Sequence, residues 1–346
     1  MNALHRIIDS EAFLAIVRNR VVIILAATVV IAATMVPGFT EFRTISLSLD
    51  RMATMGLVAI GLTVVLIAGQ LDLSGGAILA LSGIAAIGLQ EQMGQIPAAL
   101  VGFGVGILAG AVNGFLVVIL RINSLVATLA SMLFFRAMAH WITESRPISG
   151  IDPLFGLFVS RPVFGTFTGR TILFIVLILL LHLWLTRTVA GRNMFAVGSN
   201  AVSAEASGIR SRAFLFGAFV FSGTMAGVAG VIQSLAVNTG SSVFGDTITL
   251  AAIAAVVIGG TRLEGGRGSA IGTLGGLLTI AALTTAMEYQ SVPAYIQDIV
   301  TGAILLLLIL LDRLVSSTRR RDVSLAALWR AWRSRSSRMN ERTHAP

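Results

Sequence analysis

Apolar runs of about the length of a bilayer recur along the whole chain, and they restrict its fold more than any other feature. A helix that crosses the hydrocarbon core of a membrane needs about 17–25 predominantly apolar residues. We therefore expect an all-α polytopic membrane protein with about ten transmembrane helices. Two of the runs are short or interrupted, 52–70 and 247–260, as in helices that cross partway or break at a site. The runs lie at 21–36, 52–70, 75–92, 97–120, 124–143, 171–187, 213–235, 247–260, 269–288 and 294–312.

The composition also places the chain in lipid. Of its 346 residues, 55% are hydrophobic and 12% are charged, whereas soluble domains carry about 25% charged residues. The lipid bilayer is therefore the expected surrounding of most of the helical surface.

The arginines indicate how the spans are oriented. All 25 basic residues are arginine, and basic residues are enriched in the cytoplasmic loops of membrane proteins. When the expected spans alternate from a cytoplasmic N-terminus, nineteen arginines fall on the cytoplasmic side, five fall outside and Arg136 lies within a span. Both termini are therefore expected in the cytoplasm. The expected division is a cytoplasmic segment at 1–20, a transmembrane domain at 21–315 and a basic cytoplasmic tail at 316–346.

Several classes of function are excluded by residues that the chain lacks. Without lysine it has no P-loop of its own, because that motif needs a lysine at the terminal phosphates. It has no cysteine and only four scattered histidines, so we expect no metal site, no bound cofactor and no enzyme. The net charge of +9 comes from arginines beside apolar spans, which indicates membrane orientation rather than nucleic-acid binding.

Two glycine-rich turns share an order of residues. At 250–276 an apolar run breaks into a polar turn and resumes, which predicts a helical hairpin that opens on the cytoplasm. The stretch at 65–77 runs in the same order, from apolar residues through glycine and an acid to paired glycines. The match favours an internal repeat, as in many transporters, although two unrelated glycine-rich turns give a similar pattern. The candidate residues of these cytoplasmic turns are Gly69, Asp72, Ser74, Gly76, Gly259, Gly260, Glu264, Gly265, Gly266 and Gly268.

Polar side chains inside apolar spans are functional candidates, because they cost free energy in lipid. Asn113, Thr128 and Arg136 are the candidates for a transport pathway. Hydrogen bonds between helices explain Asn113 and Arg136 without a solute. Asp72 and Glu264 lie at the turns, where we expect hydration or pairing with arginine, so proton coupling is poorly supported.

Glycines recur at every fourth position of the span at 97–120. They are Gly102, Gly106, Gly110 and Gly114, and such stripes let helices pack at close range. Plain close packing and an interface that slides during transport both account for the stripe, and close packing is the simpler interpretation.

The loop at 188–212 is the longest on the expected cytoplasmic side, and it contains a predicted short helix. Asn200 is a suitable N-cap for a helix over 201–207, and Gly208 is a suitable left-handed residue to end it. Such a helix is either a docking element for a partner or part of an ordinary connector.

Five stretches of the sequence carry a resemblance to a known family. They are GQLDLSGGAILALSG at 69–83, NGFLV at 113–117, VATLASMLFFRAMA at 126–139, GRNMFAVGSNAVSAEASGI at 191–209 and AAIAAVVIGGTRLEGGRGSAIGTLGG at 251–276. Over about 45–312 the chain resembles the membrane-spanning permease subunits of bacterial ATP-binding-cassette (ABC) importers of the ribose, xylose and galactose type. Two departures from the usual family pattern, the run after Asp72 and the residue Arg262, leave the individual solute open.

The resemblance implies a permease of the bacterial inner membrane that acts as a homodimer, with the translocation path at the dimer axis. It also implies a cytoplasmic ABC ATPase subunit, which binds ATP and Mg²⁺, and an extracytoplasmic sugar-binding protein. The loop at 191–209 then resembles the segment that docks into the ATPase. The candidate residues of this coupling loop are Gly191, Arg192, Gly198, Asn200, Ala204, Glu205, Gly208 and Ile209.

Two other classes of function compete with this interpretation. A secondary carrier driven by an ion gradient uses repeats and broken helices equally well, and it is the main alternative. An intramembrane enzyme needs carboxylates or histidines clustered near one membrane face, and no such cluster occurs in the sequence.

Overall fold

The computed structural model describes residues 20–163, 167–304 and 306–307. The chain divides into two compact units, Met1–Thr301 and Gly302–Pro346. The described residues of the second unit are helical. Apart from Arg20, the expected N-terminal segment at 1–20 lies outside the described residues, as does the expected tail at 316–346.

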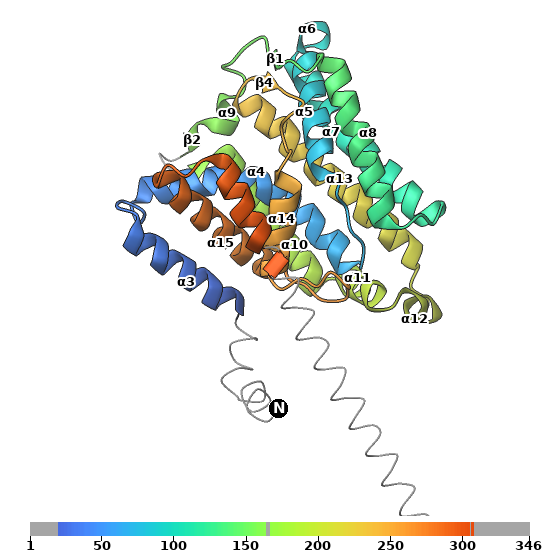
Figure 1. Cartoon of the computed structure of the whole chain (residues 1–346). Helices are drawn as coiled ribbons and strands as arrows, with labels where there is room; N and C mark the ends of the chain where they lie inside the picture. Colours follow the sequence, from blue (N-terminus) through green and yellow to red (C-terminus); the bar gives the residue numbers. More distant parts are fainter. Residues whose placement is uncertain (1–19, 164–166, 305, 308–346) are drawn as a thin grey trace, which may run out of the picture. The chain divides into compact units, whose positions relative to one another are not determined.

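Helices form nearly all of the first unit (Figure 1). A further helix begins at residue 294. The helices of ten residues or more are α3 (Arg20–Met35), α4 (Phe42–Ile67), α5 (Gly75–Gly88), α7 (Gln95–Gly114), α8 (Ser124–Thr143), α10 (Gly169–Arg187), α11 (Val189–Ser199), α13 (Ser211–Ala236), α14 (Ile248–Ile258) and α15 (Ala270–Tyr289). The shorter ones are α6 (Gln90–Met93), α9 (Leu157–Ser160), α12 (Ala201–Ala206) and the π-helical turn η1 (Phe115–Ile119), which continues α7.

Nine of the ten expected spans coincide with apolar helices in the described part of the chain. Six helices are long and apolar enough to cross a membrane, namely α4, α7 with η1, α8, α10, α13 and α15, whereas α3, α5 and α14 are shorter. The short span expected at 247–260 is confirmed as α14, with 11 residues. The expectation that the helix at 52–70 is short is wrong, because α4 begins at Phe42 and has 26 residues. The span expected at 294–312 lies only partly within the described residues, so the total of ten stays a prediction.

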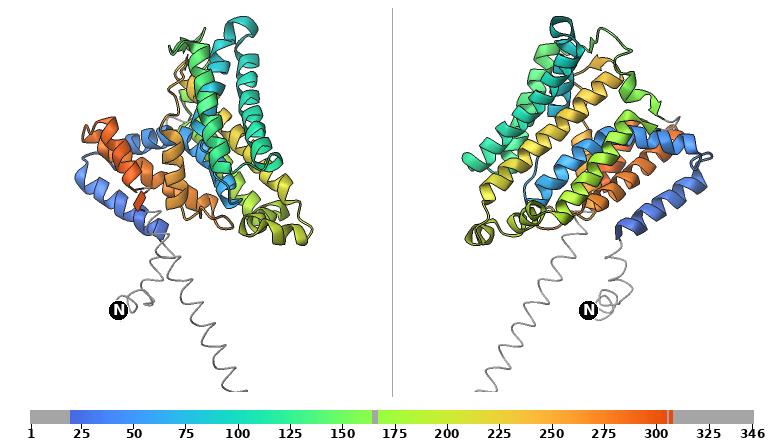
Figure 2. Two further views of the ribbon diagram at one scale, coloured as in Figure 1. Left: turned by 45° about the vertical axis from the view of Figure 1, so that its right-hand side comes forward. Right: turned by 180° about the vertical axis from the view of Figure 1, so that it is seen from behind.

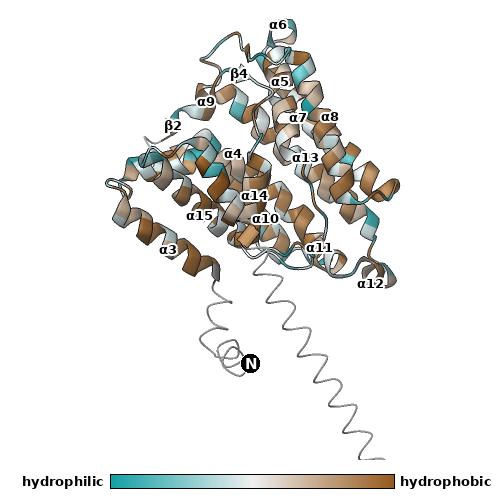
Figure 3. Cartoon of the chain, in the orientation of Figure 1, coloured by the Kyte–Doolittle hydropathy of each residue, from teal (hydrophilic) through white to brown (hydrophobic). Residues whose placement is uncertain are grey.

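Many large apolar side chains of these helices are exposed, and hydrophobic residues make up most of the helical ribbon (Figure 3). Leu108, Leu133 and Trp141 each expose more than 60% of their surface. Apolar patches of this extent are unfavourable in water but normal against acyl chains. The chain is a multi-pass membrane protein.

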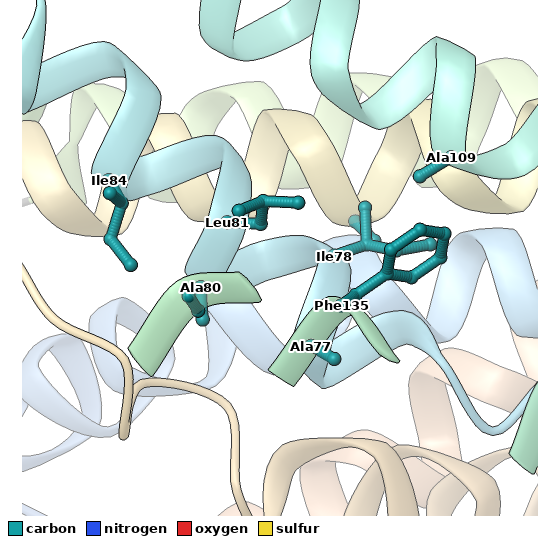
Figure 4. Close-up of a cluster of buried hydrophobic side chains, with 9 residues drawn as sticks. Ala77, Ile78, Ala80, Leu81, Ile84, Ala109 and Phe135 are labelled. Carbon is teal, nitrogen blue, oxygen red and sulfur yellow. The ribbon is translucent and has the colours of Figure 1, made fainter. Parts of the chain in front are cut away.

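α13 packs against α4, α5 and α7 at the centre of the first unit. The glycine stripe of α7 faces it, since a Cβ on Gly106 would lie 2.7 Å from both Gly223 O and Gly227 Cα. Close packing therefore accounts for the stripe. α8 covers another side of α5, where Ile78 and Phe135 belong to one buried apolar cluster (Figure 4).

Among the described residues, two antiparallel pairs of two-residue strands depart from the all-α expectation. β1 (Ile148–Ser149) pairs with β4 (Thr239–Gly240), and β2 (Pro162–Val163) pairs with β3 (Phe167–Thr168). The first pair contacts α5. It ties the connection after α8 to the segment that follows α13.

Candidate functional site

Two short apolar helices, α5 and α14, begin against each other inside the first unit. The amide N–H of Gly76, in the first turn of α5, donates to Thr249 Oγ1 in the first turn of α14 over 2.7 Å. A Cβ on Gly245, which precedes α14, would lie 2.5 Å from Gly76 O, so the backbones meet without room for a side chain. Helix N-termini carry a partial positive charge. This junction, formed by Gly76, Gly245 and Thr249, therefore brings two such termini together.

A non-helical segment precedes each of the two helices, at 70–74 before α5 and at 241–247 before α14. Backbone without helical hydrogen bonds is tolerated at membrane depth only where protein buries it or a cavity is lined by it. These two breaks in the helical backbone therefore need hydrogen bonds from the neighbouring helices.

Asp72 lies in the first break and is fully buried. Its Oδ1 accepts hydrogen bonds from Ser74 N at 3.0 Å and Ser74 Oγ at 2.6 Å, and its Oδ2 accepts one from Ser222 Oγ of α13 at 2.8 Å. The expectation of a hydrated or arginine-paired Asp72 is wrong, because hydroxyl and amide donors from two segments satisfy the carboxylate instead. The other turn acid, Glu264, is exposed as expected.

The three residues expected in a transport pathway all contact the two breaks. Asn113 of α7 donates from Nδ2 to Ser74 Oγ over 2.7 Å. Thr128 of α8 accepts from Leu73 N at 3.1 Å. Asn113 and Thr128 are fully buried. They therefore stabilise the first break from within the packed helices and do not line an open cavity.

Arg136 of α8 has the corresponding role at the second break. Its Nη1 donates to Ser242 O over 2.7 Å and to Phe244 O over 3.3 Å, and it forms an ion pair with Asp246. Its side chain is 19% exposed, whereas that of Asp246 is 55% exposed. One charged side chain thus fixes three residues of the segment that leads into α14.

The sequence analysis missed the partners of these residues. Ser222 and Thr249 carry hydroxyl groups in apolar helices. Such hydroxyls commonly bond their own backbone, so no pattern in the sequence distinguished these two. Asp246 follows Gly245 in a stretch of turn residues. Its position as an acid beside an apolar run is the one signal in the sequence that could have identified it.

The two glycine-rich turns are in contact. Gly69 has φ +75° and Gly265 has φ +84°, and a Cβ on Gly265 would lie 2.6 Å from Gly69 Cα. The same Cβ would lie 2.7 Å from the carbonyl oxygen of Gly198, near the end of α11. Gly266 N donates to Ile67 O over 2.9 Å. We call the meeting of Gly69, Gly198 and Gly265 the glycine contact. It joins both turns to α11, while the repeat itself stays a prediction.

The other candidate glycines of the turns have packing roles. Gly259 and Gly272 meet backbone to backbone, which joins α14 to α15 and confirms the helical hairpin at 250–276. A Cβ on Gly268 would lie 2.7 Å from Ile67 Cγ1. Gly260 has φ +91°, a conformation that favours glycine because it has no Cβ.

The short helix predicted in the loop at 188–212 is confirmed as α12. Asn200 Oδ1 accepts from Ser203 N over 2.9 Å as an N-cap, and Gly208 has φ +83° after the last turn. Ile209 N donates to Ala204 O over 3.0 Å and closes the end. The helix stops at Ala206, one residue before the predicted end.

One face of this helix is covered and the other is open. Ala204 is buried, whereas Glu205 is exposed and Val202 is 79% exposed. The preceding helix, α11, was not predicted. Gly191 in its first turn is buried against α10, and Arg192 next to it is exposed.

Comparison with known proteins decides the family of this chain. The family described as branched-chain amino acid transport system / permease component matches residues 44–309. The chain belongs to this permease family. The ribose import permease protein RbsC of Bacillus subtilis (strain 168) is 33% identical over 82% of this chain and 89% of its own length. No solved structure matches the chain.

Further relatives of this permease carry other names. The xylose transport system permease protein XylH of Escherichia coli (strain K12) is 31% identical over 82% of this chain and 88% of its own. The autoinducer 2 import system permease protein LsrC of Enterobacter sp. (strain 638) is 33% identical over 80% of each chain. The resemblance to ABC permeases is confirmed, and an ion-gradient carrier is not favoured. The permease is not an enzyme, and among its described residues no group of three or more His, Asp or Glu could hold a metal.

Proposed function

We propose that this permease is the membrane-spanning subunit of an ABC importer for a sugar or sugar-like solute in the bacterial inner membrane. The observation that carries the proposal is the similarity, over 82% of the chain in each case, to permeases named for ribose and for xylose. The family's own description names branched-chain amino acids. We give more weight to RbsC and XylH, because each matches most of its own length and is named for a sugar.

The proposed complex has three further components: a second copy of the chain, a cytoplasmic ABC ATPase and an extracytoplasmic sugar-binding protein. ATP and Mg²⁺ bind to the ATPase, in agreement with the absence of lysine from this chain. The binding protein delivers the solute, and the permease provides its path.

The coupling element of the proposal is α11 with α12. The open face of α12, with Val202 and Glu205, is available for the ATPase. Movement of α12 reaches the end of α11 and then both turns through the glycine contact, because Gly198 meets Gly69 and Gly265 there. The first turn leads through 70–74 to the start of α5, and the second follows the end of α14. The ATPase thus acts on the two helices that form the junction.

The junction of α5 and α14 is the proposed element of the solute path. Thr247 and Leu250 are exposed beside it, and so is Asp246 in its ion pair with Arg136. Helix N-terminal amides donate hydrogen bonds, and the carboxylate accepts them, so a neutral solute with many hydroxyl groups finds both kinds of partner. Asn113, Thr128 and Arg136 keep this junction in place.

Purification of the tagged chain from its native host in mild detergent tests the assembly. We expect an ABC ATPase to copurify, and we expect Ala204→Pro to abolish its recovery, because proline removes the amide that donates to Asn200 O in α12. Asp152→Asn, a change in an exposed loop outside α12, is the control and retains the ATPase. A chain that purifies without an ATPase, under conditions that preserve known membrane complexes, contradicts the proposal.

A further inference from the structure

An apolar crevice of about 580 Å³ lies between α4, α10, α11 and α13. Its lining includes Val64 of α4, Trp184 of α10, Met194 of α11 and Phe214 of α13. α4 packs against both α10 and α13, and the three helices lie along the rear of the unit (Figure 2, right). No charged side chain lines the crevice.

The crevice is open to the surroundings of the protein. Leu180 on its wall is 54% exposed. Gly217 of α13 is exposed, and a Cβ built on it would meet no atom within 4 Å. In a membrane the space beside these residues is occupied by hydrocarbon, because an unfilled void forfeits dispersion contacts on its lining.

Three arginines lie within three residues in sequence of residues that line the crevice. Arg187 ends α10 one helical turn beyond Trp184, Arg192 lies two residues before Met194, and Arg212 directly precedes the lining residue Ala213. All three are exposed, and none belongs to an ion pair among the described residues. α10, α11 and α13 contain no acidic residue, and Asp50, the one acid of α4, pairs with Arg170. These four helices therefore leave the charge of the three arginines uncompensated.

We propose that this crevice binds one anionic phospholipid, with an acyl chain along Val64, Leu180 and Gly217 and the phosphate at Arg187, Arg192 and Arg212. Lipid tails are as apolar as leucine, so the acyl chain alone gives no preference between lipids. The preference comes from the phosphate, because exposed guanidinium groups pair with phosphate oxygens in bidentate geometry. Trp184 lies three residues before Arg187 at the end of α10, and tryptophan is enriched at the boundary between hydrocarbon and headgroups.

The test measures lipid that the purified chain retains. The full chain is reconstituted in nanodiscs of equal parts phosphatidylglycerol and phosphatidylcholine, extracted again in mild detergent and analysed by native mass spectrometry. We expect retention of phosphatidylglycerol in preference to phosphatidylcholine. Each of Arg187→Gln and Arg212→Gln is expected to lower this retention about fivefold, whereas Arg161→Gln, an exposed arginine near β2, leaves it unchanged.

Two glycines provide a matched pair of variants for the hydrocarbon part. Gly217→Leu fills the crevice without a clash, and we expect it to lower lipid retention at least fivefold. Gly104→Leu on α7 is the control, since a Cβ there also meets no atom within 4 Å but the site is outside the crevice. Equal retention in both variants overturns the proposal, as does equal retention of the two lipids by the unaltered chain.

A second copy of the chain is the competing occupant of the crevice. Size-exclusion chromatography with light scattering measures the oligomeric state of the same variants. A change from dimer to monomer in Gly217→Leu, but not in Gly104→Leu, assigns the crevice to a subunit interface and overturns the lipid site.

Discussion

The glycine contact makes a strong prediction for Gly265→Ala. An added Cβ would lie 2.6 Å from Gly69 Cα and 2.7 Å from Gly198 O, whereas unstrained carbon atoms lie about 3.5–4.0 Å apart. The turn must therefore move by about 1 Å, which breaks the meeting of α11 with both turns. The variant carries two penalties, about 1–2 kcal/mol for a left-handed alanine and about 1–3 kcal/mol for overpacking.

Gly94 offers a control with backbone strain but no clash. It has φ +86° and ψ 168°, a conformation that is strained for any residue with a Cβ. A Cβ there would meet only Pro97 Cδ, at 4.0 Å. Because Gly265→Ala adds a clash of about 1–3 kcal/mol to its backbone strain, we expect it to be the less stable of the two variants.

The assay combines ATP-driven solute uptake in proteoliposomes with thermal unfolding of the same preparations. We expect Gly265→Ala to insert normally and to lose at least tenfold of its uptake, while Gly94→Ala keeps most of it. The reasoning is refuted if the two variants have the same uptake and the same stability, because the glycine contact would then tolerate a methyl group.

Three further variants test the elements around the junction. Ala204→Pro is expected to leave membrane insertion intact and to abolish uptake, because it disrupts the capped helix α12. Asp72→Asn removes one acceptor from a buried network with three donors, so we expect a loss of about 1–3 kcal/mol in the free energy of unfolding. The neutral side chain in Arg136→Gln cannot form an ion pair with Asp246. We expect this variant to have reduced uptake with little change in the amount of inserted protein. Uptake is measured in proteoliposomes, and stability by thermal unfolding in detergent.

Each of these variants has an outcome that contradicts its assignment. Normal uptake in Ala204→Pro means that α12 is an ordinary connector. A stability of Asp72→Asn equal to that of Asp152→Asn, in an exposed loop, means that the buried network is unimportant. Uptake in Arg136→Gln equal to that in Arg161→Gln, whose arginine is exposed near β2, means that the second break needs no support.

The helices could be predicted from the sequence because lipid imposes one simple requirement, a continuous apolar run. The capped helix at Asn200 was equally accessible, since both its N-cap and its left-handed Gly208 are local signals. The start of α4 at Phe42 was not, because Ser46, Ser48, Asp50 and Arg51 interrupt its apolar pattern. In the structure Asp50 pairs with Arg170 of α10, and Arg51 pairs with Glu288 of α15.

The site was harder to predict than the helices, because its contacts join residues far apart in the chain. Asp72 in a glycine-rich stretch suggests a solvated turn, and only the distant Ser222 shows that the carboxylate is buried. Asn113, Thr128 and Arg136 were recognised as unusual polar residues in apolar spans. Their common role, support of the two breaks, depends on which segments lie beside them, and this is a property of the tertiary structure alone.

The most direct test of the central claim is solute uptake by the reconstituted complex. Proteoliposomes contain the chain with the ATPase that copurifies with it, the sugar-binding protein is added outside, and ATP is enclosed inside. The account predicts uptake of a labelled pentose or hexose that requires ATP and the binding protein and persists when proton and sodium gradients are collapsed. Uptake that continues without ATP and stops when a gradient is collapsed would contradict it.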